Sequence, residues 1–295
     1  MTTAYCKYGF ESSYGSGTTS TWYSVYVSNI DISMAKTYVD YNTDSAYSDQ
    51  VPHKLLTSQS ITGTMTFVYD WSSLSRFLYA IAWNTYAFNY INFTHISDST
   101  NYSMVLEVSD YTSTNNYTVT YSGVVITDVK ILYRINDYIQ VEVSFTASNY
   151  TIEEDPTEPP ATINYPMSFI DTRIYLEYTD STASYDLNLS AISVTISRKI
   201  NTDTSIIGSS SKLKFYDNGY ITITGEFTFS EEEYNIYKEI KEKHLIELRV
   251  GTSTYSRFIS FRPIYIMNEG RTISSGGKVE KSFSFTGGNR SKYRI

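Results

Sequence analysis

Two short segments of this 295-residue chain recur at one fixed distance along the sequence. Ser28–Ser33 (SNIDIS) is echoed by Ser190–Thr195 (SAISVT), and Ile61–Phe67 (ITGTMTF) is echoed by Ile223–Phe229 (ITGEFTF). The distance from Ser28 to Ser190 equals that from Ile61 to Ile223, and we call it the long offset. The shared spacing carries more weight than either match, because single short motifs recur by chance in a chain of biased composition. We therefore expect two copies of one structural unit, and not a multi-repeat solenoid.

A third pair of segments marks the end of each copy. Val143–Ala147 (VSFTA) matches Phe283–Gly287 (FSFTG), and we call the distance from Val143 to Phe283 the short offset. Because this offset is smaller than the long one, the first copy carries extra residues after its Thr-Gly strand. We expect this surplus in the polar segment from Asp98 to Tyr121.

Alternation of apolar and polar residues predicts strands along most of the chain. Tyr, Thr, Val, Ile and Phe are frequent, and these residues fit a pleated surface. The run Tyr23–Ser33 alternates in this way, and so does Ile139–Thr146, where Ile139, Val141, Val143 and Phe145 share one face. Such a strand has one face on a core and one face toward solvent or a partner. The fold class we expect is mainly β.

Two segments have the period of a helix instead. Ser230–His244 begins with a capping box, Ser230 and Glu233, and ends with basic residues, as the helix dipole favours. In Asp70–Trp83 the aspartate can cap the helix, and an apolar stripe follows it, formed by Leu74, Phe77, Leu78 and Ile81. Each copy is therefore expected to contain one helix.

A proline-rich acidic stretch separates the two copies. Residues 150–166 hold four of the six prolines, so this stretch cannot donate a continuous ladder of hydrogen bonds and should contain an extended linker. The predicted domains are residues 1–152 and 166–295, joined by a linker at 153–165. Their formal charges are −6 and +2, with −4 on the linker. Opposite signs suit head-to-tail contact between copies.

Composition excludes several classes of protein. Ser (41), Thr (36) and Tyr (30) make up over a third of the chain, and 41% of residues are hydrophobic, too many for a disordered chain. Neither the first eighteen residues nor any later segment has the apolar run of a secretory signal or membrane helix, so we expect neither. The net charge of −8 argues against a surface that grips nucleic-acid phosphates. The single cysteine, Cys6, cannot form an intrachain disulfide.

Residues that could carry catalysis or bind metal are scattered. The three histidines, His53, His95 and His244, lie far apart and read as ordinary loop or helix-end residues. Glu231–Glu233 reads as a helix start and Glu153–Asp155 as a solvated linker. No nucleophile elbow, zinc-protease, phosphate-loop or EF-hand motif occurs. We predict no catalytic, metal-binding or cofactor-binding residue, and no enzyme activity.

The order of these elements resembles that of a known family. In the second copy, Tyr185–Lys199 is followed by Gly219–Gly225, and in the first copy Gly123–Lys130 is followed by Gln140–Thr146. This layout resembles the major tail tube proteins of long-tailed viruses, in the variant with a duplicated tube domain. The resemblance covers nearly the whole chain and rests on order and spacing.

The resemblance implies a fold and an assembly. Each copy would be a β-sandwich or partial barrel flanked by a helix. Three chains would form a ring with pseudo-sixfold symmetry, and stacked rings would form a tube through which viral DNA passes without specific binding. Other tail proteins would be partners, and the protein would be made in the host cytoplasm and located in the virion tail. The resemblance assigns no individual assembly or lumen residue.

Three other functions fit parts of the sequence. An extracellular β-rich filament or adhesin shares the composition, although it normally needs a signal segment. A carbohydrate-binding or hydrolytic β-sandwich would need clustered carboxylates or one aromatic platform. Another tail component of the same fold, such as a terminator or baseplate hub, is a further alternative. The hydroxyl-rich composition is similar to that of archaeal virus structural proteins and would suit acidic surroundings, since hydroxyl hydrogen bonds survive protonation of carboxylates.

Overall fold

The structure, a computed structural model, describes fourteen parts of the chain, and the account below is confined to them. They are residues 3–41, 53–82, 90–92, 103–111, 116–134, 137–154, 172–178, 184–186, 189–201, 216–230, 246–252, 258–273, 279–287 and 292–294.

These parts form a mainly β protein with one helix, α1 (Trp71–Ala82). In the first half the strands are β1 (Thr3–Phe10), β2 (Tyr23–Val25), β3 (Val27–Tyr41), β4 (His53–Val68), β5 (Tyr90–Asn92), β6 (Met104–Tyr111), β7 (Asn116–Arg134), β8 (Gln140–Ala147) and β9 (Asn149–Glu154). In the second half they are β10 (Thr172–Tyr178), β11 (Ser184–Asp186), β12 (Leu189–Asn201), β13 (Tyr216–Ser230), β14 (Ile246–Thr252), β15 (Phe258–Ile273), β16 (Val279–Gly287) and β17 (Lys292–Arg294). The expected mainly-β fold class is confirmed.

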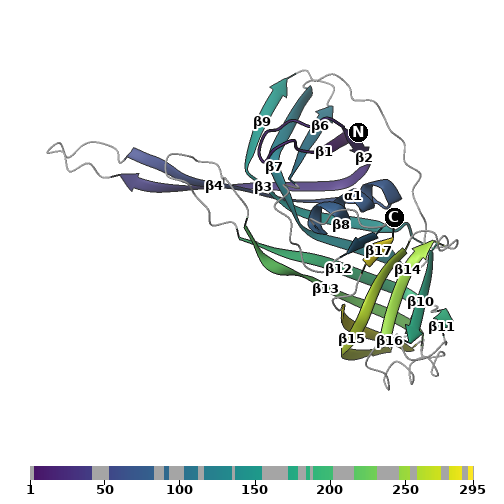
Figure 1. Cartoon of the computed structure of the whole chain (residues 1–295). Coiled ribbons are helices and arrows are strands. Elements are labelled where there is room, and N and C mark those ends of the chain that lie inside the picture. Colours follow the sequence, from purple (N-terminus) through teal and green to yellow (C-terminus); the bar gives the residue numbers. More distant parts are fainter. Residues whose placement is uncertain are drawn as a thin grey trace.

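One antiparallel sheet runs through both halves of the chain. Its strand order is β3–β4–β8–β7–β12–β13–β16–β15. The pairing of β7 with β12 joins the first half to the second half (Figure 1). At one end of the sheet, β3 and β4 extend as a long two-stranded arm.

Further strands are attached to this sheet through β7 and β15. The early part of β7 pairs with β6 and β9, and β6 pairs with β1, which pairs with β2. The early part of β15 pairs in the same way with β14 and β17, and β14 pairs with β10, which pairs with β11. β7 therefore belongs to two sheets, β15 changes partners along its length in the same way, and buried apolar side chains of both halves form the core.

The predicted cap and apolar stripe of α1 are both present. The Asp70 carbonyl accepts the first helical hydrogen bond, from the Leu74 N–H (3.1 Å), and its carboxylate accepts from the Ser73 N–H (2.8 Å). This is the geometry of an N-cap, which satisfies an N–H group of the first turn that has no partner within the helix. Leu74, Phe77, Leu78 and Ile81 are all fully buried. The helix thus lies with its apolar face on the sheets.

The core follows the alternation in the sequence. Ile139, Val141, Val143 and Phe145 are buried, as the pattern predicts, and Gln140, Glu142 and Ser144 are half-buried on the other face. In the second half the core contains phenylalanines from β13 and β16, and the Phe229 and Phe283 rings stack at 5.5 Å. The predicted strand Tyr23–Ser33 is divided at Tyr26, whose side chain is exposed.

Every strand pairing within the first half has a counterpart within the second. The bulge between Val27 and Asn29 in β3 recurs, at the long offset, between Leu189 and Ala191 in β12. In both bulges a serine hydroxyl donates to a carbonyl of the neighbouring strand, Ser28 to Thr66 (3.0 Å) and Ser190 to Thr228 (3.1 Å). The two hairpins therefore have the same register and the same irregularity.

The position of the surplus residues differs from the expectation. The bulge at Met104/Leu106 in β6 corresponds to the one at Ile246/Leu248 in β14. The distance between these two bulges is already close to the short offset, whereas the β4 strand still follows the long one. Most of the surplus therefore lies before Met104, and not around Asp98–Tyr121 as a whole. The short strand β5 falls in this interval and pairs with β17 of the other half.

Two further expectations concern the linker and the second helix. Glu153 and Glu154 belong to β9, where they pair with Thr118 and Tyr117, so the strand extends two residues into the predicted linker. The remainder of the linker, residues 155–165, lies outside the described residues, as do residues 231–244 of the predicted second helix.

Candidate assembly surface

The two ends of the long sheet are its most unusual feature. Within the described residues, β3 is paired along one side only, by β4. The segment Ile266–Ile273 of β15 is likewise paired along one side, by β16. An edge of this length exposes backbone donors and acceptors and can pair with another chain.

β3 has an internal counterpart that is paired on both sides. This counterpart, β12, lies at the long offset and pairs with β13 on one side and with β7 on the other. Ile192, Val194 and Ile196 of β12 are buried. The corresponding residues of β3 are Ile30 and Ile32, which are half-buried, and Met34, which is 40% exposed. The β3 edge is therefore exposed where β12 is covered by a neighbouring strand.

β15 differs from its own counterpart in the same way. This counterpart, β7, precedes it by the short offset, and Val129, Ile131 and Tyr133 of β7 are buried. The corresponding residues of β15 are exposed, namely Glu269, Arg271 and Ile273, the last with 63% of its surface accessible. Burial raises the pKa of the Tyr133 hydroxyl, which remains neutral where β7 pairs with β12.

The joint between β7 and β12 is reinforced by a buried arginine. The Arg198 Nη1 donates a hydrogen bond of 2.8 Å to the Ile81 carbonyl in the last turn of α1. The carbonyls at a helix C-terminus lack partners within the helix, and a cation there is favourable. Arg198 is buried, so this contact fixes α1 of the first half against β12 of the second.

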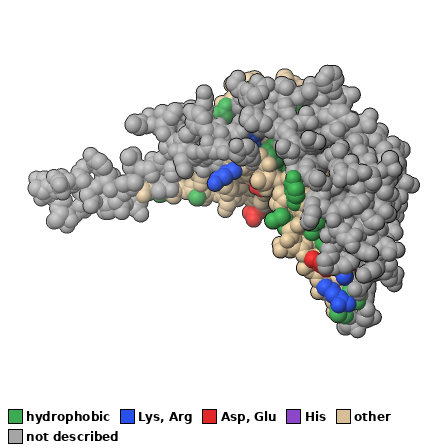
Figure 2. Space-filling model, turned by 60° about the horizontal axis from the view of Figure 1, so that its bottom comes forward, with side chains coloured by type: hydrophobic (Ala, Val, Ile, Leu, Met, Phe, Trp, Pro, Cys, Tyr) green, Lys and Arg blue, Asp and Glu red, His purple; other side chains and the backbone are tan. Residues whose placement is uncertain are grey.

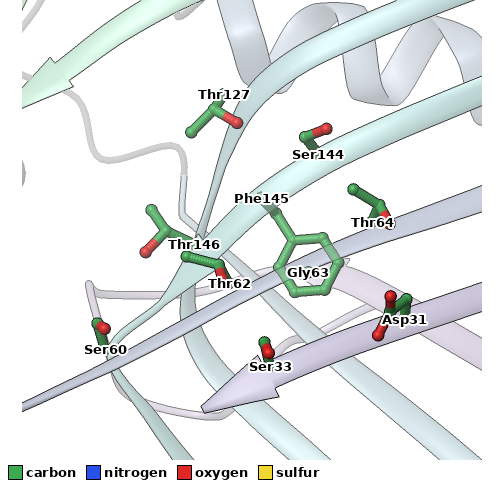
Figure 3. A pocket seen from close by; sticks show the side chains of 10 residues that line it. All are labelled: Asp31, Ser33, Ser60, Thr62, Gly63, Thr64, Thr127, Ser144, Phe145 and Thr146. Carbon is green, nitrogen blue, oxygen red and sulfur yellow. The ribbon is translucent and has the colours of Figure 1, made fainter. Parts of the chain in front are cut away.

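The sheet face opposite the core is polar and hollowed. A hollow of about 540 Å³ lies over β3, β4, β7 and β8 (Figure 3). Seven of its ten lining residues are Ser or Thr, and the others are Asp31, Gly63 and Phe145. Gly63 has no side chain, and the Phe145 ring lies across it. In Figure 2 the described part of this side is a band of uncharged polar side chains and backbone, interspersed with hydrophobic side chains and a few charges.

The charges on this face are few and of mixed sign. By strand alternation it carries five acidic and three basic side chains among the described residues, which are Asp31, Asp128, Glu142, Glu226 and Glu280, and Lys130, Arg134 and Lys199. Lys130 and Glu142 are directly opposite each other on β7 and β8. The face is therefore close to neutral, with a small acidic excess.

Among the histidines and the acidic runs, His53, Glu153 and Glu154 lie in the described residues. His53 begins β4, where it pairs with Tyr41, and His95, His244 and Glu231–Glu233 lie outside the described residues. No group of three potential metal ligands is found in the described parts of the chain. Burial raises the pKa of the Cys6 thiol, with a smaller contribution from the nearby Glu107 carboxylate, so the reactive thiolate form is disfavoured.

A family model described as phage tail tube protein matches residues 3–287. The chain belongs to the phage tail tube protein family. No curated protein sequence matches it. Membership in a family of structural proteins makes this a structural protein of the virion tail and favours a non-enzymatic role. In the described part of this tail tube protein, no helix has the length and hydropathy to cross a membrane.

Sequence reasoning did not identify the residues of this surface. The residues of β3 alternate like those of β12, so nothing in that pattern marks β3 as a strand at the end of the sheet. One signal is present in the tail tube chain: in β15, Glu269 and Arg271 lie at the short offset from Val129 and Ile131 of β7. Charges on the inner face of an edge strand are typical of edges that must not pair indiscriminately.

Proposed function

We propose that this protein forms the hollow tube of a long viral tail. Three chains close into a ring, rings stack into a tube, and the genome passes through the lumen during ejection. The observation that carries the proposal is the long sheet, which is continuous across β7 and β12 and, within the described residues, is unpaired along the outer sides of β3 and of Ile266–Ile273. Closing the open ends with further copies would bury the exposed backbone, and full closure is the complete way to remove sheet edges.

The chain would supply two tube domains to each ring. The matching strand pairings and bulges of the two halves support a duplication, with domains at 1–152 and 166–295. We place the linker within residues 155–165, because Glu153 and Glu154 are paired in β9. Eight strands from each of three chains would give a barrel of 24 strands, in which the β7–β12 joint and the joint between chains alternate.

The polar face opposite α1 would line the lumen. A surface that conducts DNA should not hold phosphates, since contacts with Lys and Arg dominate nucleic-acid affinity. The Ser and Thr lining and the small acidic excess meet this requirement. Contacts between stacked rings and with other tail proteins would be made by loops and arms outside this sheet.

Cryo-electron microscopy of the purified protein, after concentration, tests the proposal. We expect hollow rings or tubes with three chains per ring and pseudo-sixfold symmetry. A thin solid thread would favour the filament or adhesin alternative, and a persistent monomer would overturn the proposal. Copy number in purified virions separates a tube protein, which is abundant, from a terminator or hub of the same fold.

Adaptation to acidic surroundings can be tested on the same assembled tubes. If hydroxyl hydrogen bonds dominate the joints, tubes should persist when the pH is lowered to about 4, near the pKa of free carboxylates. Dissociation in that range would contradict an adaptation to acidic surroundings.

A further inference from the structure

The joint between β7 and β12 is defined residue by residue. The two strands are antiparallel, and Ile192 faces Tyr133, Val194 faces Ile131 and Ile196 faces Val129. On the other face of the sheet, Ser193 is opposite Leu132. The joint thus has one buried apolar face and one face on the polar side of the sheet.

The two open edges match the two sides of this joint in detail. β3 corresponds to β12 at the long offset, and the hairpin bulges coincide. β15 corresponds to β7 at the short offset, and the bulge at Ile126/Asp128 coincides with the one at Ile266/Asn268. Bulges fix the local twist and bend of a strand. The edges therefore have the same shape as strands that already pair with each other.

We infer that β15 of one chain pairs with β3 of the neighbouring chain in the ring, in the register of the β7–β12 joint. In this register Ile273 faces Ile30, Arg271 faces Ile32 and Glu269 faces Met34, while Thr272 faces Asp31 on the polar face. The inference rests on the proposed ring and adds the partner strand and the alignment of its residues.

Exposed apolar side chains support this alignment. Met34 and Ile273 are large apolar residues with exposed side chains, and both lie on the face that is buried in the β7–β12 joint. In the proposed register Ile273 is directly opposite Ile30, which is half-buried within its own chain. A slip by one residue would turn each of these side chains to the polar face, so the hydrophobic pattern opposes it. A slip by two residues keeps the faces and is the main competitor.

Engineered disulfides can distinguish the two alignments. The variant with Asp31→Cys and Thr272→Cys places a cysteine pair directly opposite in the proposed register. The variant with Ser33→Cys and Thr272→Cys is aligned only after a slip by two residues. Disulfides need Cβ atoms about 3.5–4.5 Å apart, so diagonal neighbours do not satisfy the geometry. The native Cys6 is buried and does not compete.

The β7–β12 joint provides a matched control. Ser193→Cys with Leu132→Cys is the same pair within one chain, and its oxidation shows that this position of the pleat accepts a disulfide. After assembly and mild oxidation, we expect covalent dimers and closed trimers from the Asp31/Thr272 variant on a denaturing gel, and monomer alone from the wild type.

The outcomes separate this inference from the proposed function. Rings in micrographs together with crosslinking only in the Ser33/Thr272 variant would overturn the register and leave the ring intact. Rings with no crosslink in either variant, while the internal control oxidises, would also overturn it. Absence of rings at high protein concentration would overturn the ring and the register together.

Discussion

At the scale of single residues, Glu11 connects three separate parts of the chain. Its buried carboxylate accepts hydrogen bonds from the N–H groups of Gly15 (2.9 Å), Gly17 (2.9 Å) and Gly123 (3.0 Å), and from the Ser103 hydroxyl. Gly123 has a φ of 60° and lies where β7 passes from one sheet to the other. Glu11 therefore holds the bend of β7 against the loop that follows β1.

Glu11→Gln should destabilise the fold markedly. The amide has one acceptor oxygen and would present its NH₂ group to donors, so buried N–H groups would lose their partner. We expect the free energy of unfolding to fall by about 2–3 kcal/mol, measured by urea denaturation. Glu107→Gln is a matched control: its ion pair with Lys7 (2.6 Å) is partly exposed, and its loss should cost about 0–1 kcal/mol. Equal effects of the two variants would contradict this role of Glu11.

Arg198 has a comparable role between the two halves. Arg198→Met keeps most of the apolar volume but leaves the Ile81 carbonyl without this donor, and we expect a loss of about 1.5–3 kcal/mol. Lys199→Met, at the exposed neighbouring position, should leave the free energy of unfolding nearly unchanged. Denaturation of both variants monitored by circular dichroism checks the difference, and an equal cost would show that the hydrogen bond to Ile81 is not what matters.

At the scale of elements, each half has a glycine of one strand opposite a phenylalanine of the adjacent strand. Gly63 of β4 is opposite Phe145 of β8, and Gly225 of β13 is opposite Phe285 of β16. A Cβ atom at either glycine would lie 2.4 Å from the ring of its phenylalanine. The ring thus fills the space that the glycine leaves and covers its backbone.

Gly63→Ala should destabilise the fold by about 1–3 kcal/mol through overpacking. Adding Phe145→Leu should recover part of this loss, since the contact is with a side chain that the second substitution shortens. Gly225→Ala should be rescued less by Phe285→Leu, because the added Cβ would also lie 2.6 Å from the Ser193 carbonyl oxygen, which is backbone. Thermal denaturation of the four single variants and two double variants gives both coupling energies. Strictly additive effects at Gly63 would contradict the packing argument.

At the scale of the whole molecule, the open β15 edge carries charges where β7 carries apolar residues. Glu269 and Arg271 lie on the face that the proposed joint would bury, and burying charge opposes association. These two residues should therefore delay sheet growth until a ring can close.

The variant with Glu269→Val and Arg271→Ile reproduces the β7 sequence at these positions. We expect its critical concentration for assembly to fall about tenfold, which corresponds to about 1.4 kcal/mol per joint. Light scattering at increasing protein concentration measures it, and Asn268→Ser, on the opposite face, serves as the control. An unchanged or higher critical concentration would show that the charges do not restrain pairing.

The sequence determined the local elements of this protein because their causes are local. The alternation from Ile139 to Phe145, the Asp70 cap and the stripe of α1 depend on residues that are neighbours along the chain. The long and short offsets likewise predicted strands that the structure pairs in matching registers.

The tertiary structure alone decided which strands meet. The β7–β12 joint, the pairing of β5 with β17, and the contacts of Glu11 and Arg198 connect residues far apart in sequence. β3 and β12 have similar patterns, yet one is exposed and the other covered, since burial depends on which strand lies alongside. A residue's own chemistry sets which face of a strand it favours, whereas the presence of a neighbour at the edge is a property of the assembled sheet.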